Sequence, residues 1–162
     1  QGHAALGAKM AGHILRRLKL DNDTIRMVCS LLQYHDYGNG QDIDIRLARR
    51  ALHRIGEEAF PAIFAVKRAD IYAQSEYMRE EKLSRLAQWQ SLYKEILEKK
   101  QCVSLKTLAV GGSDLLAVGW KPGKDLGEAL QHLLELVLEE PERNTKEWLL
   151  AAAEEYRGES GK

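Results

Sequence analysis

The 162-residue sequence is poor in cysteine and proline and carries no excess charge of either sign. Its two cysteines, Cys29 and Cys102, lie far apart without a CxxC pair, which argues against a disulfide framework and favours a reducing cytoplasm. Basic and acidic residues each number 24, which excludes a polycation that wraps nucleic acid without a local patch. The uncharged runs at 108–113 and 115–120 are too short to span a membrane.

The sequence predicts an all-α fold, because apolar residues recur at the helical period and almost nowhere alternate as they do in strands. We expect helices over residues 3–18, 23–35, 43–55, 76–100, 125–138 and 145–156, with another that opens at Pro61. They divide into a helical bundle at 1–77, a connecting helix at 78–101 and a small helical tail at 102–162. Because the chain begins with Gln and turns helical at once, we expect it to be part of a longer protein.

The first expected helix has two kinds of face. One is a row of large apolar side chains, namely Leu6, Met10, Ile14 and Leu18. The other consists of small residues that permit close helix packing, namely Gly7, Ala8, Ala11 and Gly12.

Two polar residues continue apolar stripes of expected helices. His35 follows such a stripe in the second helix, and Asp70 follows one in the helix that opens at Pro61. Burying an unpaired polar group costs about 2–7 kcal/mol, so each needs a partner. One interpretation is a His–Asp hydrogen bond inside the bundle. The other is a divalent-metal site formed by His3, His35 and Asp70, with Asp36 as an additional candidate, since nitrogen and oxygen ligands suit a hard or borderline metal.

Two segments could contact phosphate groups. The first is a stripe of four arginines on one side of the third helix, namely Arg46, Arg49, Arg50 and Arg54. The second is a loop that leads into a helix and contains Gly119, Lys121, Gly123 and Lys124. Free N–H groups at a helix start, flanked by lysines, can hold a phosphate. A solvated helix face and an ordinary tight turn would explain the same residues.

Three stretches carry a family resemblance: GHAALG…YHD at 2–36, RADIYAQS at 68–75, and the segment at 111–153. The last contains D-L-x-x-x-G-x-x-P-G-x-x-x-G, followed by N-T-x-E-x-L. These positions are Asp114, Leu115, Gly119, Pro122, Gly123, Gly127, Asn144, Thr145, Glu147 and Leu149. Together the stretches resemble the C-terminal half of bacterial tRNA nucleotidyltransferases, the CCA-adding enzymes and poly(A) polymerase relatives with an HD-type domain.

The resemblance implies a transferase whose chemistry lies in an N-terminal head. That head carries a Gly-Ser nucleotide motif, a pair of Mg²⁺-binding aspartates and the groups that select CTP and ATP, none of which is present in this sequence. We therefore expect the chain alone to be inactive and to bind the acceptor arm of tRNA through the arginine stripe and the glycine loop. His3, His35 and Asp70 match the last three members of the HD pattern, so the resemblance implies an incomplete divalent-metal site.

Two other functions compete with tRNA binding. An HD-superfamily phosphohydrolase would use a metal-bound water against a cyclic phosphate or a phosphomonoester, and it needs the earlier His-Asp pair of the HD pattern. A helical packing module would have no affinity for RNA. Because the tail that tRNA binding requires is present, we favour tRNA binding. The sequence leaves open whether the product is CCA or poly(A).

Overall fold

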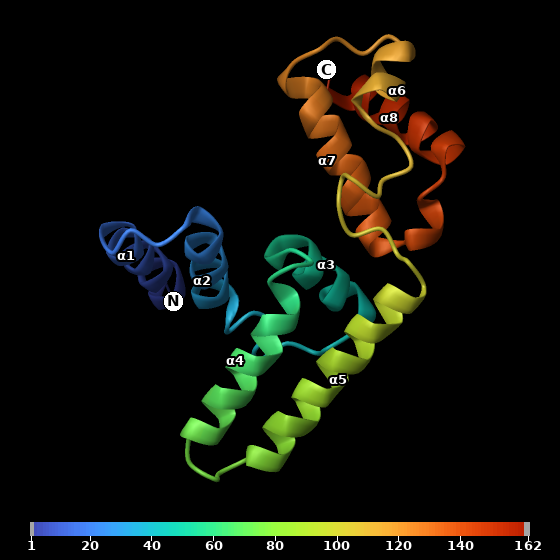
Figure 1. The fold of residues 1–162 in the computed structure, drawn as a ribbon. Coiled ribbons are helices and arrows are strands. Elements are labelled where there is room, and N and C mark those ends of the chain that lie inside the picture. The colour runs from blue at the N-terminus through green and yellow to red at the C-terminus, as the bar shows by residue number, and fades with distance from the viewer. Residues whose placement is uncertain (1, 161–162) are drawn as a thin grey trace. The chain divides into compact units, whose positions relative to one another are not determined.

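The computed structural model describes residues 2–160, in two compact units that divide between Ile96 and Leu97. Every regular element in the described residues is a helix, which confirms the predicted all-α fold (Figure 1). Within those residues no helix is both long enough and apolar enough to cross a membrane.

The first unit begins with a tightly packed pair of helices, α1 (His3–Arg17) and α2 (Asn22–Tyr34). They meet through the small residues of α1. Ala8 and Gly12 are buried, and the Cys29 Sγ on α2 lies 3.3 Å from the Ala8 carbonyl oxygen, to which it donates. A Cβ added at Gly12 would lie 3.3 Å from the same sulfur, so the close approach depends on glycine. The small-residue packing face predicted from the sequence is therefore confirmed.

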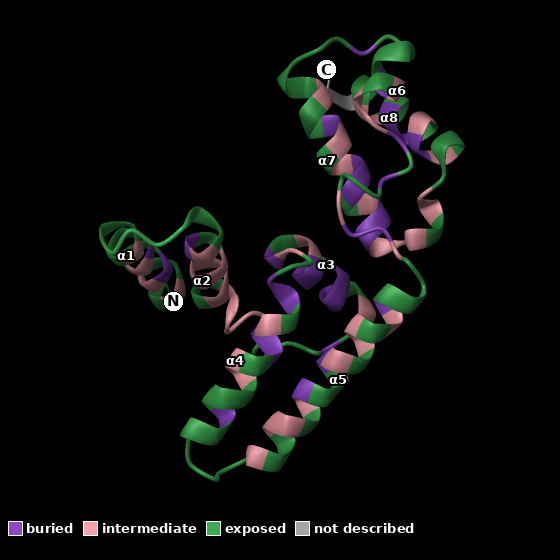
Figure 2. Ribbon diagram, viewed as in Figure 1, coloured by how far each residue is buried: buried purple, intermediate pink, exposed green. Residues whose placement is uncertain are grey.

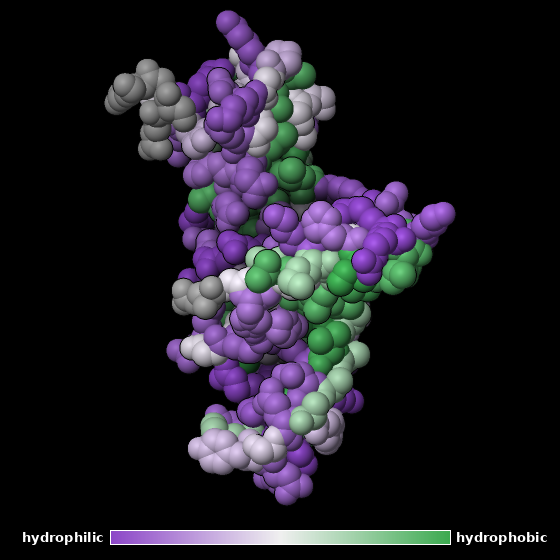
Figure 3. Space-filling view, turned by 90° about the vertical axis from the view of Figure 1, so that its left-hand side faces the viewer, coloured by the Kyte–Doolittle hydropathy of each residue, from purple (hydrophilic) through white to green (hydrophobic). Residues whose placement is uncertain are grey.

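The large apolar row of α1 stays in solvent. Leu6, Met10, Ile14 and Leu18 are between 45% and 61% exposed, because α2 packs against the small-residue face instead. Figure 3 shows patches of hydrophobic residues, coloured green, on the face that it presents. Such a row of exposed large side chains is unusual, since isolated exposed apolar residues are the normal case.

Three further helices complete the first unit: α3 (Ile45–Ile55), α4 (Phe60–Ala73) and α5 (Arg79–Glu98), of which the last two residues lie beyond the boundary. Asp44 begins α3 by accepting a hydrogen bond from the Leu47 backbone N–H at 2.7 Å. Their shared core contains an aromatic cluster in which the Phe60 and Tyr93 ring centroids are 5.1 Å apart. The buried positions follow one side of each helix (Figure 2).

The second unit contains α6 (Gly112–Ala117), α7 (Lys124–Glu139), a short 3-10 helix (Pro141–Arg143) and α8 (Lys146–Ser160). Its core is made of aliphatic side chains that are fully buried, among them Leu115, Leu133, Leu134, Leu138 and Leu149. The helix α6 lies in the glycine-rich stretch, for which the sequence pattern predicts no helix.

A single asparagine holds the loop before α6 against the start of α8. The Asn144 Oδ1 accepts from the Ala109 N–H at 2.8 Å, and its Nδ2 donates to the Thr107 carbonyl at 3.1 Å. The next residue, Thr145, accepts from the Trp148 N–H and so caps α8. These bonds explain the physical role of the adjacent Asn-Thr pair.

Candidate metal and RNA-binding sites

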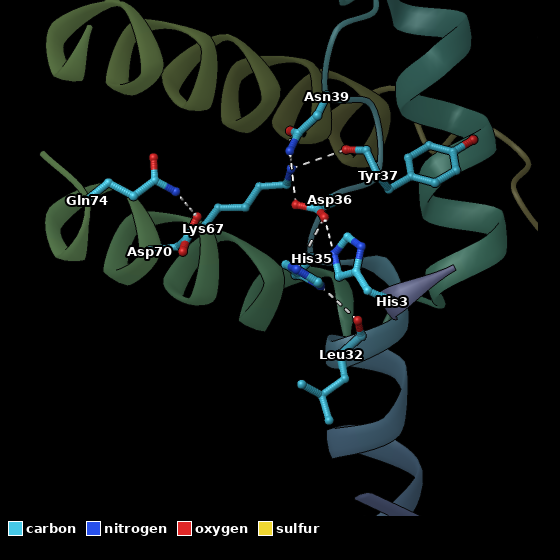
Figure 4. A network of polar contacts seen from close by, with 9 residues as sticks. All are labelled: His3, Leu32, His35, Asp36, Tyr37, Asn39, Lys67, Asp70 and Gln74. Atoms are coloured by element: carbon cyan, nitrogen blue, oxygen red, sulfur yellow. Dashed lines mark hydrogen bonds and ion pairs between the residues drawn. The ribbon is translucent and has the colours of Figure 1, made fainter. Parts of the chain in front are cut away.

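His3, His35 and Asp36 converge at one end of the α1–α2 pair (Figure 4). His3 opens α1, whereas His35 and Asp36 directly follow α2, so the antiparallel pairing of the two helices brings them together. The Asp36 Oδ2 lies 3.0 Å from the His3 Nε2 and 3.3 Å from the His35 Nε2. One ligand atom from each residue lies within 4.8 Å of the other two.

The Leu32 carbonyl determines what this group can do chemically. It lies 2.8 Å from the His35 Nδ1, and because a carbonyl only accepts, that nitrogen carries a proton. In neutral His35 the Nε2 then presents a lone pair to the Asp36 carboxylate, and two acceptors would face each other. The contact is favourable if His35 is protonated or if a cation lies between the two groups. The donor set therefore fits a divalent cation.

Asp70 lies outside this group, although the sequence predicts it as a ligand with His3 and His35. Its Oδ2 accepts a hydrogen bond from the Gln74 Nε2 at 2.7 Å, one turn further along the end of α4. The structure brings Asp36 to the two histidines, and the assignment of Asp70 as a metal ligand stays a prediction.

A cavity of about 270 Å³ adjoins the group, between α4, α5 and the turn that follows α2. His35, Asp36 and Asp70 all line it, so the two carboxylates border one space. Lys67 reaches in from α4 and donates to the Tyr37 carbonyl at 3.2 Å and to the Asn39 Oδ1 at 3.1 Å (Figure 4).

Lys67 also lines the cavity, and it is not among the site residues predicted from the sequence. Burial lowers the pKa of its ammonium group, while the negative charge of Asp36 acts in the opposite direction. A signal was available, because Lys67 lies four residues after Ile63 and three before Asp70, on the same stripe of α4.

The exposed part of the arginine stripe of α3 consists of three residues. Arg46, Arg50 and Arg54 are exposed, whereas Arg49 is only 3% exposed, and its assignment to RNA binding stays a prediction. At about 100° per residue, Arg49 is turned by about 60° from Arg46, towards the side on which Leu52 is buried.

The loop before α7 contains two glycines with a positive φ, a backbone conformation that favours glycine. Gly119 and Gly123 have φ values of 91° and 149°, in the region that favours glycine. Lys121 is exposed. Lys124 begins α7 and pairs with Glu128 at 2.9 Å, a contact that raises the pKa of Lys124. The side chain of Lys121 is therefore exposed to solvent, whereas Lys124 forms an ion pair with Glu128.

A family model described as tRNA nucleotidyltransferase domain 2 matches residues 3–153. This span includes both the group formed by His3, His35 and Asp36, here called the histidine group, and the glycine loop at 119–124. No curated protein and no solved structure gives a significant match.

Proposed function

The chain belongs to the tRNA nucleotidyltransferase domain 2 family, and from this premise we propose that it binds tRNA and positions it for nucleotide addition. The acceptor arm is the bound element, and a head domain outside this chain adds nucleotides from CTP and ATP in the cytoplasm, with Mg²⁺ as its metal. The added product is a CCA end or a poly(A) tail.

The observation that carries this proposal is the exposed row of Arg46, Arg50 and Arg54 on α3. Successive members are four residues apart, and the opposite side of the helix is buried in the core, so the row is held on a rigid support. Arginine contacts to phosphate fix the position of a nucleic acid without reading its sequence. The Gly119–Lys124 loop of the second unit, with Lys121 exposed, supplies a further candidate contact.

The test is tRNA binding across a salt series. Replacing Arg46 and Arg50 with Ala should weaken binding and reduce the salt slope of log K by roughly 1.4–1.8, since each lost phosphate contact removes about 0.7–0.9. A matched control replaces Arg26 and Lys106 with Ala, which removes the same charge elsewhere and should leave the slope unchanged. Equal slopes for the wild type and the Arg46/Arg50 variant would refute the proposal.

A second candidate, a metal-dependent phosphohydrolase, is favoured by the geometry of His35 and Asp36. A divalent cation bound there would activate water for attack on a phosphate ester. The Leu32 carbonyl would orient His35, and the Asn39 Nδ2, which donates to the Asp36 Oδ1 at 3.1 Å, would orient the carboxylate. Hydrolysis of a cyclic nucleotide in the presence of Mn²⁺, lost in Asp36→Asn, would support this function independently of tRNA binding.

A further inference from the structure

The exposed apolar row of α1 has the form of a helix ridge. Its members, Leu6, Met10, Ile14 and Leu18, follow one another at intervals of four residues, the spacing of the ridges by which α-helices pack into the grooves of other helices. Among the described helices, α1 packs extensively only against α2, which contacts its small-residue face, so the ridge is left to solvent (Figure 1). An apolar ridge held on a folded support is typical of a binding surface.

A row of basic residues runs parallel to the ridge. Lys9, His13 and Arg17 each immediately precede a member of the ridge, so they share its four-residue spacing and lie about 100° around the helix from it. All three are exposed. On its other side the ridge is bordered by Gly7 and Ala11, which are half-buried, so the basic row lies on one side of the ridge only.

The positive charge of this surface has no counter-charge on the same helix. The sequence of α1 contains no acidic residue, and Lys9 and Arg17 form no ion pair with any residue that the structure describes. The nearest acids in the sequence, Asp21 and Asp23, make their hydrogen bonds and ion pair within α2. An occupant with carboxylates opposite the basic row would therefore match the surface in charge as well as in shape.

A second copy of the chain fits this surface poorly. If two copies of α1 packed antiparallel through their ridges, the two basic rows would lie alongside each other. In a parallel pairing, each basic row would meet a helix side without any acidic residue, since α1 has none. The first arrangement places like charges together and the second leaves them unpaired, so neither uses the basic row for binding.

An anionic membrane is also a poorer fit. Helices that lie in a membrane surface present a broad apolar face that commonly includes aromatic residues. The ridge of α1 contains no aromatic residue, and its four-residue spacing winds it by about 120° around the helix between Leu6 and Leu18. A second helix that crosses α1 can follow a winding ridge, whereas a flat bilayer does not.

We propose that α1 binds an acidic amphipathic α-helix of a partner protein. Apolar side chains of that helix pack on the ridge, and its carboxylates pair with Lys9 and Arg17, and with His13 when the imidazole is protonated. The helix crosses α1 at about −50°, the angle at which two ridges of four-residue spacing interlock. Helix recognition of this kind uses anchors one turn apart, as the members of the ridge are. The inference does not depend on tRNA binding.

A pair of synthetic peptides tests the proposal. Both are helical, as long as α1, and carry leucine at every fourth position, and the residue before each leucine is glutamate in one peptide and lysine in the other. The full chain is titrated into each labelled peptide, and fluorescence anisotropy gives the dissociation constant. The glutamate peptide should bind about tenfold or more tightly than the lysine peptide, and added salt should reduce this preference. Equal affinities, or no binding of either peptide, would overturn the proposal.

Serine substitutions assign the binding to the ridge. Met10→Ser/Ile14→Ser should weaken binding of the glutamate peptide by about tenfold or more, because two apolar anchors are lost. Leu105→Ser/Leu116→Ser removes two comparably exposed apolar side chains from the second unit and should leave the affinity unchanged. Wild-type affinity in the Met10→Ser/Ile14→Ser variant would contradict the proposal.

Charge reversal tests the basic row without altering any apolar side chain. Lys9→Glu/Arg17→Glu should exchange the preference, so that the lysine peptide binds more tightly than the glutamate peptide. Lys106→Glu/Lys121→Glu makes the same change of charge at exposed positions of the second unit and should preserve the wild-type preference. A preference that fails to reverse in the Lys9→Glu/Arg17→Glu variant would refute the pairing with carboxylates.

Measurements without peptide identify the other occupants. Dimerisation in sedimentation that Met10→Ser/Ile14→Ser abolishes would identify a second copy, and flotation with phosphatidylserine vesicles that the same variant abolishes would identify a membrane. Either result would overturn the proposal, whereas a monomer that does not float supports it. The Arg46→Ala/Arg50→Ala variant should bind the glutamate peptide like the wild type, so failure of tRNA binding and failure of this proposal give different results.

Discussion

At the scale of single residues, Gly38 and Gly40 are required for different reasons. Both have left-handed backbones, with φ values of 76° and 74°. A Cβ added at Gly40 would meet nothing within 4 Å, whereas one at Gly38 would overlap the Trp89 ring. Only the backbone penalty applies at Gly40, and at Gly38 a steric penalty is added to it.

Alanine substitutions separate these two penalties. Gly40→Ala should lower the free energy of unfolding by about 1–2 kcal/mol, the cost of a left-handed residue with a side chain. Gly38→Ala should cost about 1–3 kcal/mol more, because Trp89 must move. Urea unfolding followed by tryptophan fluorescence measures both, and equal costs would mean that the ring moves aside freely.

Metal binding tests the composition of the histidine group. Calorimetry with Mn²⁺, Co²⁺ and Ni²⁺ should show weak binding, since three protein ligands leave the coordination shell open. His35→Ala and Asp36→Asn should each weaken it at least about tenfold, as expected for a lost ligand or orienting group. Asp70→Asn is the comparison that decides between the assignments, because a loss there would place Asp70 in the site. Submicromolar affinity in the wild type would contradict the expected weakness.

At the scale of helices, Asp114 links α6 to the first residue of α8. Lys146 donates to its carboxylate and the Gly111 N–H donates at 2.9 Å, and these contacts lower the pKa of Asp114 below its usual 3.8. A carboxyl group whose pKa is lowered by folding stabilises the fold above its unfolded pKa. That stabilisation is lost as the pH falls through the folded value.

Thermal melts of Asp114→Asn should therefore depend on pH. The variant should melt below the wild type at neutral pH, and the difference should shrink as the pH falls below 3.8 and through the lowered pKa of Asp114, where the wild-type carboxyl group becomes protonated. Asp125→Asn, an exposed acid in the first turn of α7, is the matched control for loss of a charge. A difference in melting temperature that does not change with pH would assign the effect to packing.

Helix positions were predictable because they depend on local signals. The third helix was expected from residue 43 and begins at Ile45, since the Asp44 side chain caps it. The six-residue α6 was missed, because it lies in a glycine-rich stretch and is too short for a period to be seen. One of the residues that bonds to Asp114 of α6 is Lys146 of α8, which is far away in the sequence, so this contact leaves no local signal.

The site was predictable only in part, because tertiary contacts decide it. The stripe pattern of α2 selected His35, but the position of Asp36 depends on the turn that follows, where the Asn39 N–H donates to the Asp36 carbonyl at 3.0 Å. Spacing alone counted Arg49 with the exposed arginines, although a turn of about 60° around the helix places it in the core. At a position between the exposed and the buried side of a helix, the burial of the side chain depends on which elements pack against that helix.

At the scale of the whole molecule, zero net charge confines any RNA affinity to local patches. The full chain should incorporate no labelled CTP or ATP into tRNA, because its sequence contains no Gly-Ser nucleotide motif with paired aspartates. A filter assay with tRNA, Mg²⁺ and each nucleotide measures this. Incorporation above that of a heat-inactivated sample would show that the chain carries its own transfer site.

The exposed row on α1 inverts the usual relation between residue size and tolerance to substitution. In most helices the large apolar positions accept the fewest replacements, whereas here Leu6 and Ile14 face solvent and Ala8 and Gly12 form the contact with α2. A saturation library of α1 scored for folding should therefore retain polar side chains at the leucine and isoleucine positions. Variants with a larger side chain at Ala8 or Gly12 should almost all fail to fold and be lost from the library. The smallest residues of the helix would then be the ones least tolerant of substitution.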